Sequence, residues 1–128
     1  MIDKRLLKIA SNTKFYGLKN IYTYKTNLKN SICGDKISIE ISLKKNTIQE
    51  LRYETEACIF CQASASTLAN IAKNTNLSDL KKNLSKYLNF SKKVPKKFKN
   101  LTYLLKDKYM NRKDCILLPF KAFYKAIK

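Results

Sequence analysis

The sequence has no histidine, only two glycines and two prolines, and only three arginines among its 128 residues. The missing histidine removes the commonest protein ligand for metals and the usual general base, which excludes serine–histidine and cysteine–histidine nucleophilic machinery. Scarce glycine and proline exclude a linker-rich or collagen-like chain. No run of about 18 apolar residues is present, so the sequence predicts no transmembrane helix and no membrane partner.

The beginning of the sequence shows no targeting segment. Charged residues follow the first two positions at once, so we find neither an apolar signal core nor an arginine-rich presequence. Apolar residues make up 45% and charged residues 28% of the chain, as in ordinary globular proteins. We therefore expect a single domain over residues 1–128 with its own core, located in the cytoplasm.

The net charge of +18 comes from 27 basic and nine acidic residues. Such a charge suggests nucleic acid or another anionic partner. However, 24 of the basic residues are lysine, and arginine is the residue preferred for bidentate contacts to phosphates and bases. Lysine, asparagine and isoleucine together account for 48 of the 128 residues, which is typical of an AT-rich genome. We therefore expect no specific nucleic-acid binding, and we interpret the dense basic stretch at 92–99 as a solvated loop or a docking surface for an acidic partner.

Strand patterns come early in the chain. Residues 36–43 alternate strictly between apolar and polar, which predicts a half-buried strand. Residues 44–47 form a turn, and residues 48–54 return as a hairpin partner with Leu51 and Tyr53 pointing inward. β-branched and aromatic residues at 21–24 predict another strand.

Helical patterns dominate the rest of the chain. We expect helices over residues 3–12, 62–73, 78–90, 101–110 and 115–127, with a loop over 91–100. Leu6, Leu7 and Ala10 would share one side of the first helix, and Ser78 would cap the third. Pro119 must lie in the first turn of the last helix or bend it. These elements indicate an α+β fold in which helices cover a small antiparallel sheet of about three strands.

The four cysteines are Cys33, Cys58, Cys61 and Cys115. In a cytoplasmic protein they are thiols or metal ligands rather than disulfides. Cys58 and Cys61 form a lone Cys-x-x-Cys pair, which is weak evidence for either a redox or a zinc site. Placement is more informative, because Cys33 precedes the alternating strand, Cys58 begins a helix and Cys115 begins the last helix. Cysteines at the ends of elements can meet at one rim of a domain, and helix N-termini favour the thiolate.

Three segments around these cysteines carry a family resemblance. They are Asn-Ser-Ile-Cys-Gly-Asp-Lys-Ile-Ser-Ile at 30–39, Cys-Ile-Phe-Cys-Gln-Ala-Ser-Ala-Ser at 58–66 and Arg-Lys-Asp-Cys-Ile-Leu-Leu-Pro-Phe-Lys-Ala at 112–122. In this order they resemble the three signatures of the NifU/IscU/SufU iron–sulfur scaffold proteins. The resemblance covers the chain from about Gly17 onward and implies a SufE/NifU-like fold.

The resemblance implies that Cys33, Asp35, Cys58 and Cys115 form the metal site. In the family this site holds a transient [2Fe-2S] cluster or, in the SufU-like branch, a zinc ion. Thiolates bind both strongly, whereas a carboxylate is a harder and weaker partner for a cluster, so a mixed site suits assembly and hand-off. For zinc the same four groups complete a tetrahedron. Cys33 or Cys115 would accept persulfide sulfur from a cysteine desulfurase.

Two residues depart from the family pattern. Asp114 stands where IscU-type members have histidine and SufU-type members have lysine, and we interpret it as a helix cap or a neighbour of the metal site. Cys61 is extra to the pattern. We interpret it as a packing residue. Two alternatives stay open: Cys61 replaces Asp35 as a metal ligand, or it serves as a resolving thiol. Two features resemble the SufU branch more closely: the long interval between Cys58 and Cys115, and Arg112 three residues before Cys115.

Three functional hypotheses follow from the sequence. The first is a scaffold, non-enzymatic and monomeric or weakly oligomeric, that collects sulfur from a desulfurase and iron from a donor and passes a [2Fe-2S] cluster to acceptor proteins. The second is a zinc-dependent sulfurtransferase that accepts persulfide from a cysteine desulfurase. The third is a basic nucleic-acid-binding domain whose cysteines are incidental.

Overall fold

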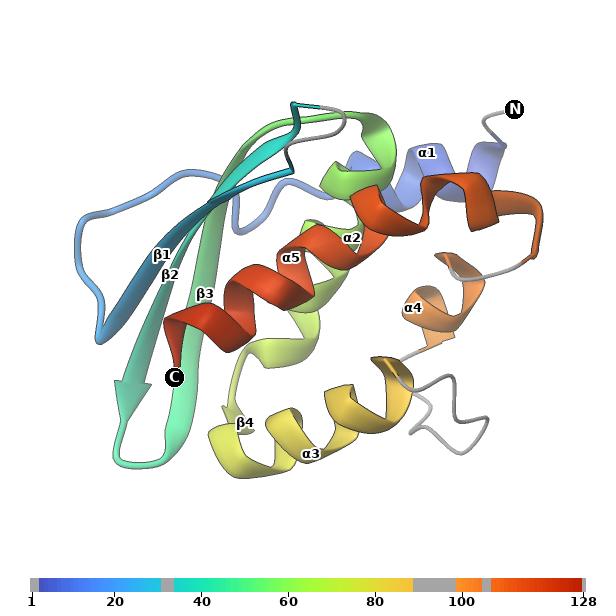
Figure 1. The fold of residues 1–128 in the computed structure, drawn as a ribbon. Coiled ribbons are helices and arrows are strands. Elements are labelled where there is room, and N and C mark those ends of the chain that lie inside the picture. The colour runs from blue at the N-terminus through green and yellow to red at the C-terminus, as the bar shows by residue number, and fades with distance from the viewer. Residues whose placement is uncertain (1–2, 31–33, 89–98, 105–106, 128) are drawn as a thin grey trace.

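The computed structural model describes residues 3–30, 34–88, 99–104 and 107–127. The elements in chain order are α1 (Lys4–Ala10), β1 (Tyr24–Lys29), β2 (Lys36–Lys44), β3 (Thr47–Glu56), α2 (Ile59–Ala72), β4 (Thr75–Asn76), α3 (Leu77–Leu88), α4 (Lys99–Leu104), the 3₁₀ helix η2 (Asp107–Arg112) and α5 (Lys113–Ala126). Figure 1 shows a sheet on one side of the molecule and the helices packed beside it. The predicted α+β class is therefore confirmed.

The sheet has the strand order β1-β2-β3-β4, and each neighbouring pair is antiparallel. The predicted hairpin is β2–β3, in which Ile39 lies opposite Tyr53 and Ile41 opposite Leu51. These four side chains are buried, because the period-2 alternation puts every second residue on the same face. The sheet is thus built mainly from three strands, as predicted, and β4 adds a two-residue fourth strand.

Helices α2 and α5 cover one face of the sheet (Figure 1). Helix α5 contacts β1 and β2, whereas α2 contacts β3 and packs against both α1 and α5. The inner positions of α2 are small residues, which let its backbone approach its neighbours closely: Ala63, Ser64, Ala65, Ser66, Ala69 and Ala72 are all buried. Because α2 is buried on most sides, it is the central element of this fold. In the described ranges no helix combines the length and apolar character needed to cross a membrane.

A loop between α1 and β1 crosses the opposite face of the sheet. Glu40, on β2, is only 2% exposed, and its Oε1 accepts hydrogen bonds from the amides of Lys19 (2.9 Å) and Asn20 (3.1 Å). Arg52, on β3, donates to the carbonyls of Gly17 (2.6 Å) and Tyr16 (2.9 Å). Two charged side chains on adjacent strands therefore hold this loop in place.

That loop explains why the predicted strand at 21–24 is wrong. Ile21 is 73% exposed and Tyr22 48% exposed, and β1 begins only at Tyr24. The aromatic and β-branched residues there favour a strand locally, but the loop is held over the face of the sheet by Glu40 and Arg52, and regular pairing with β2 starts only at Tyr24. Tertiary hydrogen bonding has overridden local propensity.

The helices differ from prediction at several boundaries. In α1 the buried pair is Leu6 and Ile9, and Leu7 is 48% exposed, because residues three apart share a helix face. Helix α3 starts at Leu77, before Ser78, and the side chain of Asn76 accepts the capping hydrogen bond from the Asp79 amide (3.1 Å).

The predicted helix at 101–110 is α4 from Lys99 to Leu104 followed by η2, rather than one continuous helix. Residues 91–98 of the predicted loop, and with them most of the dense basic stretch, lie outside the described residues. Pro119 is the seventh residue of α5, so of the two predicted alternatives the first-turn position is wrong, and a bend of the helix at Pro119 stays a prediction.

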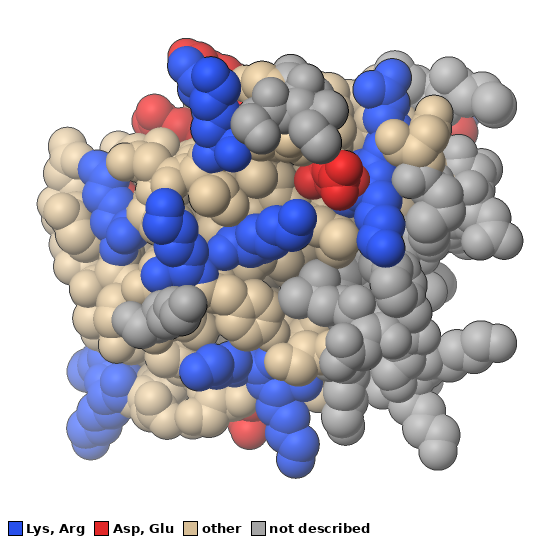
Figure 2. Space-filling model, viewed as in Figure 1, with Lys and Arg blue, Asp and Glu red and all other residues tan. Residues whose placement is uncertain are grey.

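On the face drawn in Figure 2, the basic side chains of the described residues are spread out rather than gathered in one patch. Lysine and arginine occur over all parts of the described surface on this face, and acidic groups are few and isolated. This distribution agrees with the even spread of lysine along the sequence.

Candidate metal centre

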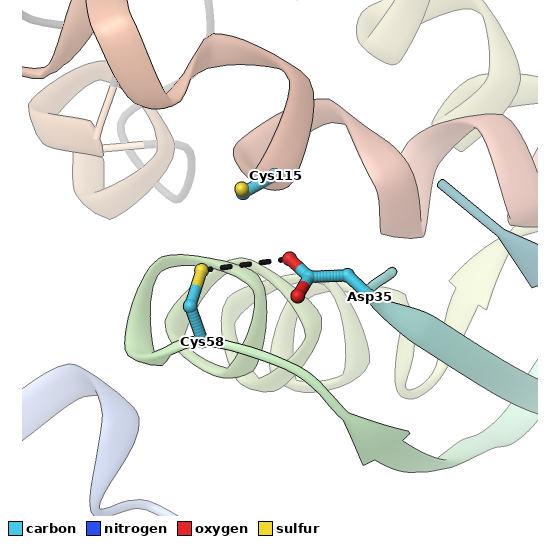
Figure 3. Close-up of side chains that lie close together, drawn as sticks. All are labelled: Asp35, Cys58 and Cys115. Atoms are coloured by element: carbon cyan, nitrogen blue, oxygen red, sulfur yellow. Dashed lines mark hydrogen bonds between the residues drawn. The ribbon is translucent and has the colours of Figure 1, made fainter. Parts of the chain in front are cut away.

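Three of the four predicted ligands meet in space. One oxygen of Asp35 and the sulfurs of Cys58 and Cys115 all lie within 4.8 Å of one another. Figure 3 shows the three side chains pointing toward a common point from three different elements. The fourth predicted ligand, Cys33, lies outside the described residues.

Each of the three donors is placed by the end of an element. Asp35 directly precedes β2, after a turn in which the amide of Gly34 donates to the Asn30 carbonyl (2.8 Å) and the amide of Asn30 to the Asp35 carbonyl (2.7 Å). Gly34 has a φ of +77°, a conformation that L side chains rarely adopt. Cys58 is the extended N-cap residue of α2, and Cys115 is the third residue of α5. Because α2 and α5 pack together beside the sheet, these ends meet at one rim.

The site is buried on two sides and accessible on the third. Asp35 is 8% and Cys115 5% exposed, whereas Cys58 is half-buried. The Cys58 thiol donates a hydrogen bond to Oδ2 of Asp35 at 3.5 Å. Helices α2 and α5 have 14 residues each, and the two cysteines lie at or just inside their N-terminal ends.

The starts of the two helices are tied together by further contacts. The guanidinium of Arg112, the N-cap residue of α5, lies 5.7 Å from the ring centre of Phe60 in the first turn of α2. The buried hydroxyl of Ser64 donates to the carbonyl of Ile116 at 2.6 Å. This bond was not predicted from the sequence. No signal in the sequence singles out this acceptor, because Pro119 removes the intrahelical donor of the Cys115 carbonyl, four residues before it, and not that of the Ile116 carbonyl.

The donor set fits a thiophilic metal. Tetrahedral zinc with sulfur ligands at about 2.3 Å would separate two sulfurs by about 3.8 Å, so donors within 4.8 Å need only small side-chain rotations to share an ion. Cysteine thiolates also bind iron–sulfur clusters, and one carboxylate among the ligands weakens the binding of the cluster. In the described part of the chain, this is the one group of three cysteine, aspartate or glutamate side chains gathered closely enough to bind a metal ion.

Cys61 and Asp114 do not belong to this group of three donors. Cys61 lies one turn after Cys58 and is fully buried in the hydrophobic core, as expected for a packing residue. Asp114 is exposed in the first turn of α5, where a negative charge is favourable beside the helix N-terminus. The N-cap position itself is occupied by Arg112, so the interpretation of Asp114 as the cap is wrong.

Comparison with known proteins identifies the family. The NifU-like N-terminal domain family matches the chain over residues 4–118. The chain belongs to this family. The predicted resemblance to NifU/IscU/SufU scaffold proteins is therefore confirmed, and the match includes Asp35, Cys58 and Cys115.

Curated relatives of this NifU-like domain include a Thermotoga maritima protein named iron–sulfur cluster assembly scaffold protein IscU. It is 27% identical over 135 residues, which cover all of this chain and 93% of the relative. An uncharacterized protein of Borreliella burgdorferi is 30% identical over 102 residues, covering 72% of this chain and 66% of the relative.

Solved structures share the fold of this NifU-like domain. A Fervidobacterium islandicum protein described as an iron–sulfur cluster assembly scaffold for the SUF system superimposes with a TM-score of 0.83 at 20% identity, covering 98% of this chain and 96% of the other. The N-terminal part of a NifU-like protein from Brucella abortus gives a TM-score of 0.82 at 22% identity, covering 98% and 90% of the two chains. The small sheet with helices on one face is thus the fold of the family.

Proposed function

We propose that this NifU-like domain, residues 1–128, is a scaffold on which a labile [2Fe-2S] cluster is assembled and then passed to acceptor proteins. The observation that carries the proposal is the convergence of Asp35, Cys58 and Cys115 within 4.8 Å at the starts of β2, α2 and α5. Cys33, two residues before Asp35 in the chain, is the proposed fourth ligand. The name of the Thermotoga maritima relative supports the same function.

The cluster is the cargo of this site, and each donor has a separate part in holding it. The thiolates of Cys33, Cys58 and Cys115 bind iron, and each gives up a proton when it does so. The carboxylate of Asp35 binds iron less firmly, which keeps the cluster transferable. The half-buried side of the site at Cys58 gives donors and acceptors access.

Sulfur reaches the site from a cysteine desulfurase in the cytoplasm. The thiolate of Cys33 or Cys115 attacks the outer sulfur of the desulfurase persulfide, an S–S bond forms on the scaffold, and the desulfurase thiolate leaves. Two electrons from an external thiol reductant then convert the transferred sulfur to sulfide. The protein acts as a carrier, monomeric or weakly oligomeric, and has no need of nucleic acid.

Anaerobic reconstitution with ferrous iron and sulfide tests the proposal. Cys58→Ser and Cys115→Ser each remove one thiolate, so we expect both variants to lose the visible chromophore and the iron and sulfide retained after desalting. Asp114→Asn and Cys61→Ala are the matched controls, because neither side chain belongs to the group of three. Undiminished retention in both serine variants would contradict the scaffold function.

The second candidate is the zinc-dependent sulfurtransferase. It is favoured by the same donor separations, since two thiolates and a carboxylate with one further cysteine complete a zinc tetrahedron. Elemental analysis after anaerobic purification separates the two functions. One zinc per chain, no chromophore and a faster desulfurase would establish the sulfurtransferase in place of the scaffold.

A further inference from the structure

A second site lies at the other end of α2. A cavity of about 900 Å³ opens between α1, the C-terminal half of α2 and the first turn of α4. Asn70, which lines it, is 12 residues from Cys58, or about 18 Å along the helix. Its volume is in the range of small-molecule sites, which run from about 300 to 1,000 Å³. The cavity is thus separate from the metal centre and large enough for a ligand of its own.

The lining of this cavity is basic. Arg5 and Lys8 from α1 and Lys73 from the end of α2 border it, and among the described residues no carboxylate does. In the described part of the chain none of the three cations is in an ion pair. The nearby carboxylate of Asp3 already accepts hydrogen bonds from the Leu6 amide and the hydroxyls of Tyr103 and Tyr109. Three unneutralised cations around one cavity repel one another, and a bound anion would relieve that repulsion.

Two of these cations are held by aromatic rings. The guanidinium of Arg5 lies 4.1 Å from the ring centre of Tyr103 and donates one hydrogen bond, to Oδ1 of Asn100 at 3.3 Å. Lys73 Nζ lies 5.6 Å from the ring centre of Phe15. A guanidinium has five N–H donors in a planar fork that matches phosphate, so Arg5 keeps donors for a ligand while the stacking fixes its plane.

The neutral residues that line the cavity suit an uncharged part of a ligand. Asn12 accepts from the Lys14 amide through its oxygen, so its NH₂ group remains to donate. Asn70 donates to the Ser66 carbonyl, so its amide oxygen remains to accept. Ile9 and Ile71 add apolar surface beside them. One amide donor, one amide acceptor and apolar contacts suit the edge and face of a heterocyclic base.

We propose that this cavity binds a nucleotide, with its phosphates held by Arg5, Lys8 and Lys73 and its base placed against Asn12, Asn70 and the two isoleucines. The class is a nucleoside phosphate with two or more negative charges, since three cations line one cavity together with two amide side chains and two isoleucines. This site does not depend on the proposed cluster function.

Calorimetric titration of the full chain with ADP at physiological salt tests the proposal. We expect the triple variant Arg5→Gln, Lys8→Gln, Lys73→Gln to weaken ADP binding by at least about tenfold. The matched control is Lys81→Gln, Lys121→Gln, Lys125→Gln, which removes the same charge from a second basic cavity of about 440 Å³. The ADP affinity of this control is expected to stay within about twofold of that of the parent protein. The two triple variants have the same net charge, so a difference between them reports on the cavity.

The possible outcomes separate the proposal from its competitors. Equal losses in both triple variants would show attraction to the overall charge of +18 and would overturn the site. Tripolyphosphate or citrate binding as tightly as ADP would overturn the assignment to a nucleotide, and a glutamate-rich peptide displacing ADP at lower concentration would identify a protein-docking surface instead. The double variant Lys8→Gln, Lys73→Gln leaves the Arg5–Tyr103 stack intact, so it keeps the test valid if the triple variant unfolds. Cys58→Ser should bind ADP normally, which keeps the outcome independent of the cluster.

Discussion

The carboxylate of Asp3 joins three segments of the chain. Its Oδ1 accepts the amide of Leu6 (2.8 Å) and thereby caps α1, while its Oδ2 accepts the hydroxyls of Tyr103, on α4, and Tyr109, on η2. The Tyr109 hydroxyl is 2.6 Å from Oδ2. Burial, followed by the hydrogen bonds to Asp3 and Tyr103, raises the pKa of Tyr109 well above its ordinary value.

Tyr109→Phe removes this buried hydroxyl and should lower the free energy of unfolding at pH 7 by about 1–2 kcal/mol. Because the folded-state pKa is raised, the stabilisation is complete below the unfolded pKa of about 10 and is lost as the pH rises toward the folded value. The difference between parent and variant should therefore narrow between about pH 10 and pH 11. Urea unfolding across this range measures it, with the exposed Tyr22→Phe as the control. A constant difference at all pH values would contradict the role given to burial.

At the metal centre, replacing Asp35 should change how long the cargo is held. Asp35→Cys exchanges a hard carboxylate oxygen for a thiolate, which iron prefers. We expect the reconstituted cluster to transfer to an apo-ferredoxin at least about tenfold more slowly than from the parent protein, a difference of about 1.4 kcal/mol in activation free energy. The decay of the scaffold's visible absorbance during transfer measures this rate. Faster transfer from the variant would show that the carboxylate strengthens the site.

At the scale of elements, a buried hydrogen bond joins α2 and α5. Ser64 is fully buried and donates to the Ile116 carbonyl, one turn before the proline of α5. Ser64→Ala leaves that carbonyl without this donor, and we expect a loss of about 1–3 kcal/mol in the free energy of unfolding. The exposed Ser85→Ala, which removes a hydroxyl from the surface of α3, should cost less than about 0.5 kcal/mol. Equal effects in the two variants would show that the buried bond adds nothing.

The loop on the outer face of the sheet depends on Glu40. Glu40→Ala removes the acceptor for the amides of Lys19 and Asn20 and the partner of Lys25, whose Nζ lies 3.7 Å away. We expect trypsin to cut after Lys19 at least about tenfold faster, because releasing the loop no longer breaks those hydrogen bonds. The control is Glu56→Ala, an exposed carboxylate paired with Lys36 at 3.8 Å. Unchanged cleavage in the Glu40 variant would place the anchoring of the loop elsewhere.

The sequence could predict those elements whose position and buried face are determined by their own residues. The strand at 36–43 alternates strictly, so its buried face was predictable, and Cys58 and Cys115 could be placed at helix starts by the change of pattern around them. The strand predicted at 21–24 was wrong because the deciding partners, Glu40 and Arg52, lie far along the chain.

The same limit applies to the two sites. Spacing alone gave no reason for Asp35, Cys58 and Cys115 to meet, and the family resemblance supplied that expectation. No motif connects Arg5 and Lys8 with Lys73, so the basic cavity could be found only after α1 had been seen to pack on α2.

At the scale of the whole molecule, the charge of +18 opposes folding. Basic groups are dispersed over the face drawn in Figure 2, and four ion pairs occur among the described residues. Raising sodium chloride from about 20 to about 300 mM shortens the Debye length from about 20 Å to about 6 Å, which screens this repulsion. We expect the melting temperature to rise by several degrees, measured by circular dichroism, with an equal osmolality of glycerol as the comparison. A falling melting temperature would show that the ion pairs outweigh the repulsion.

The donors of the metal centre occupy the margins of their elements. Asp35 stands before the first pair of the β2 ladder, Cys58 before the first turn of α2, and Cys115 within the first turn of α5. Rotation about a donor's side-chain bonds breaks no ladder or helix hydrogen bond, because those bonds join backbone groups. A few bond rotations can therefore swing a donor aside while ladder and helices persist. On the proposed scaffold function, unloading is then a local, reversible movement, and the emptied protein needs no refolding before it is loaded again.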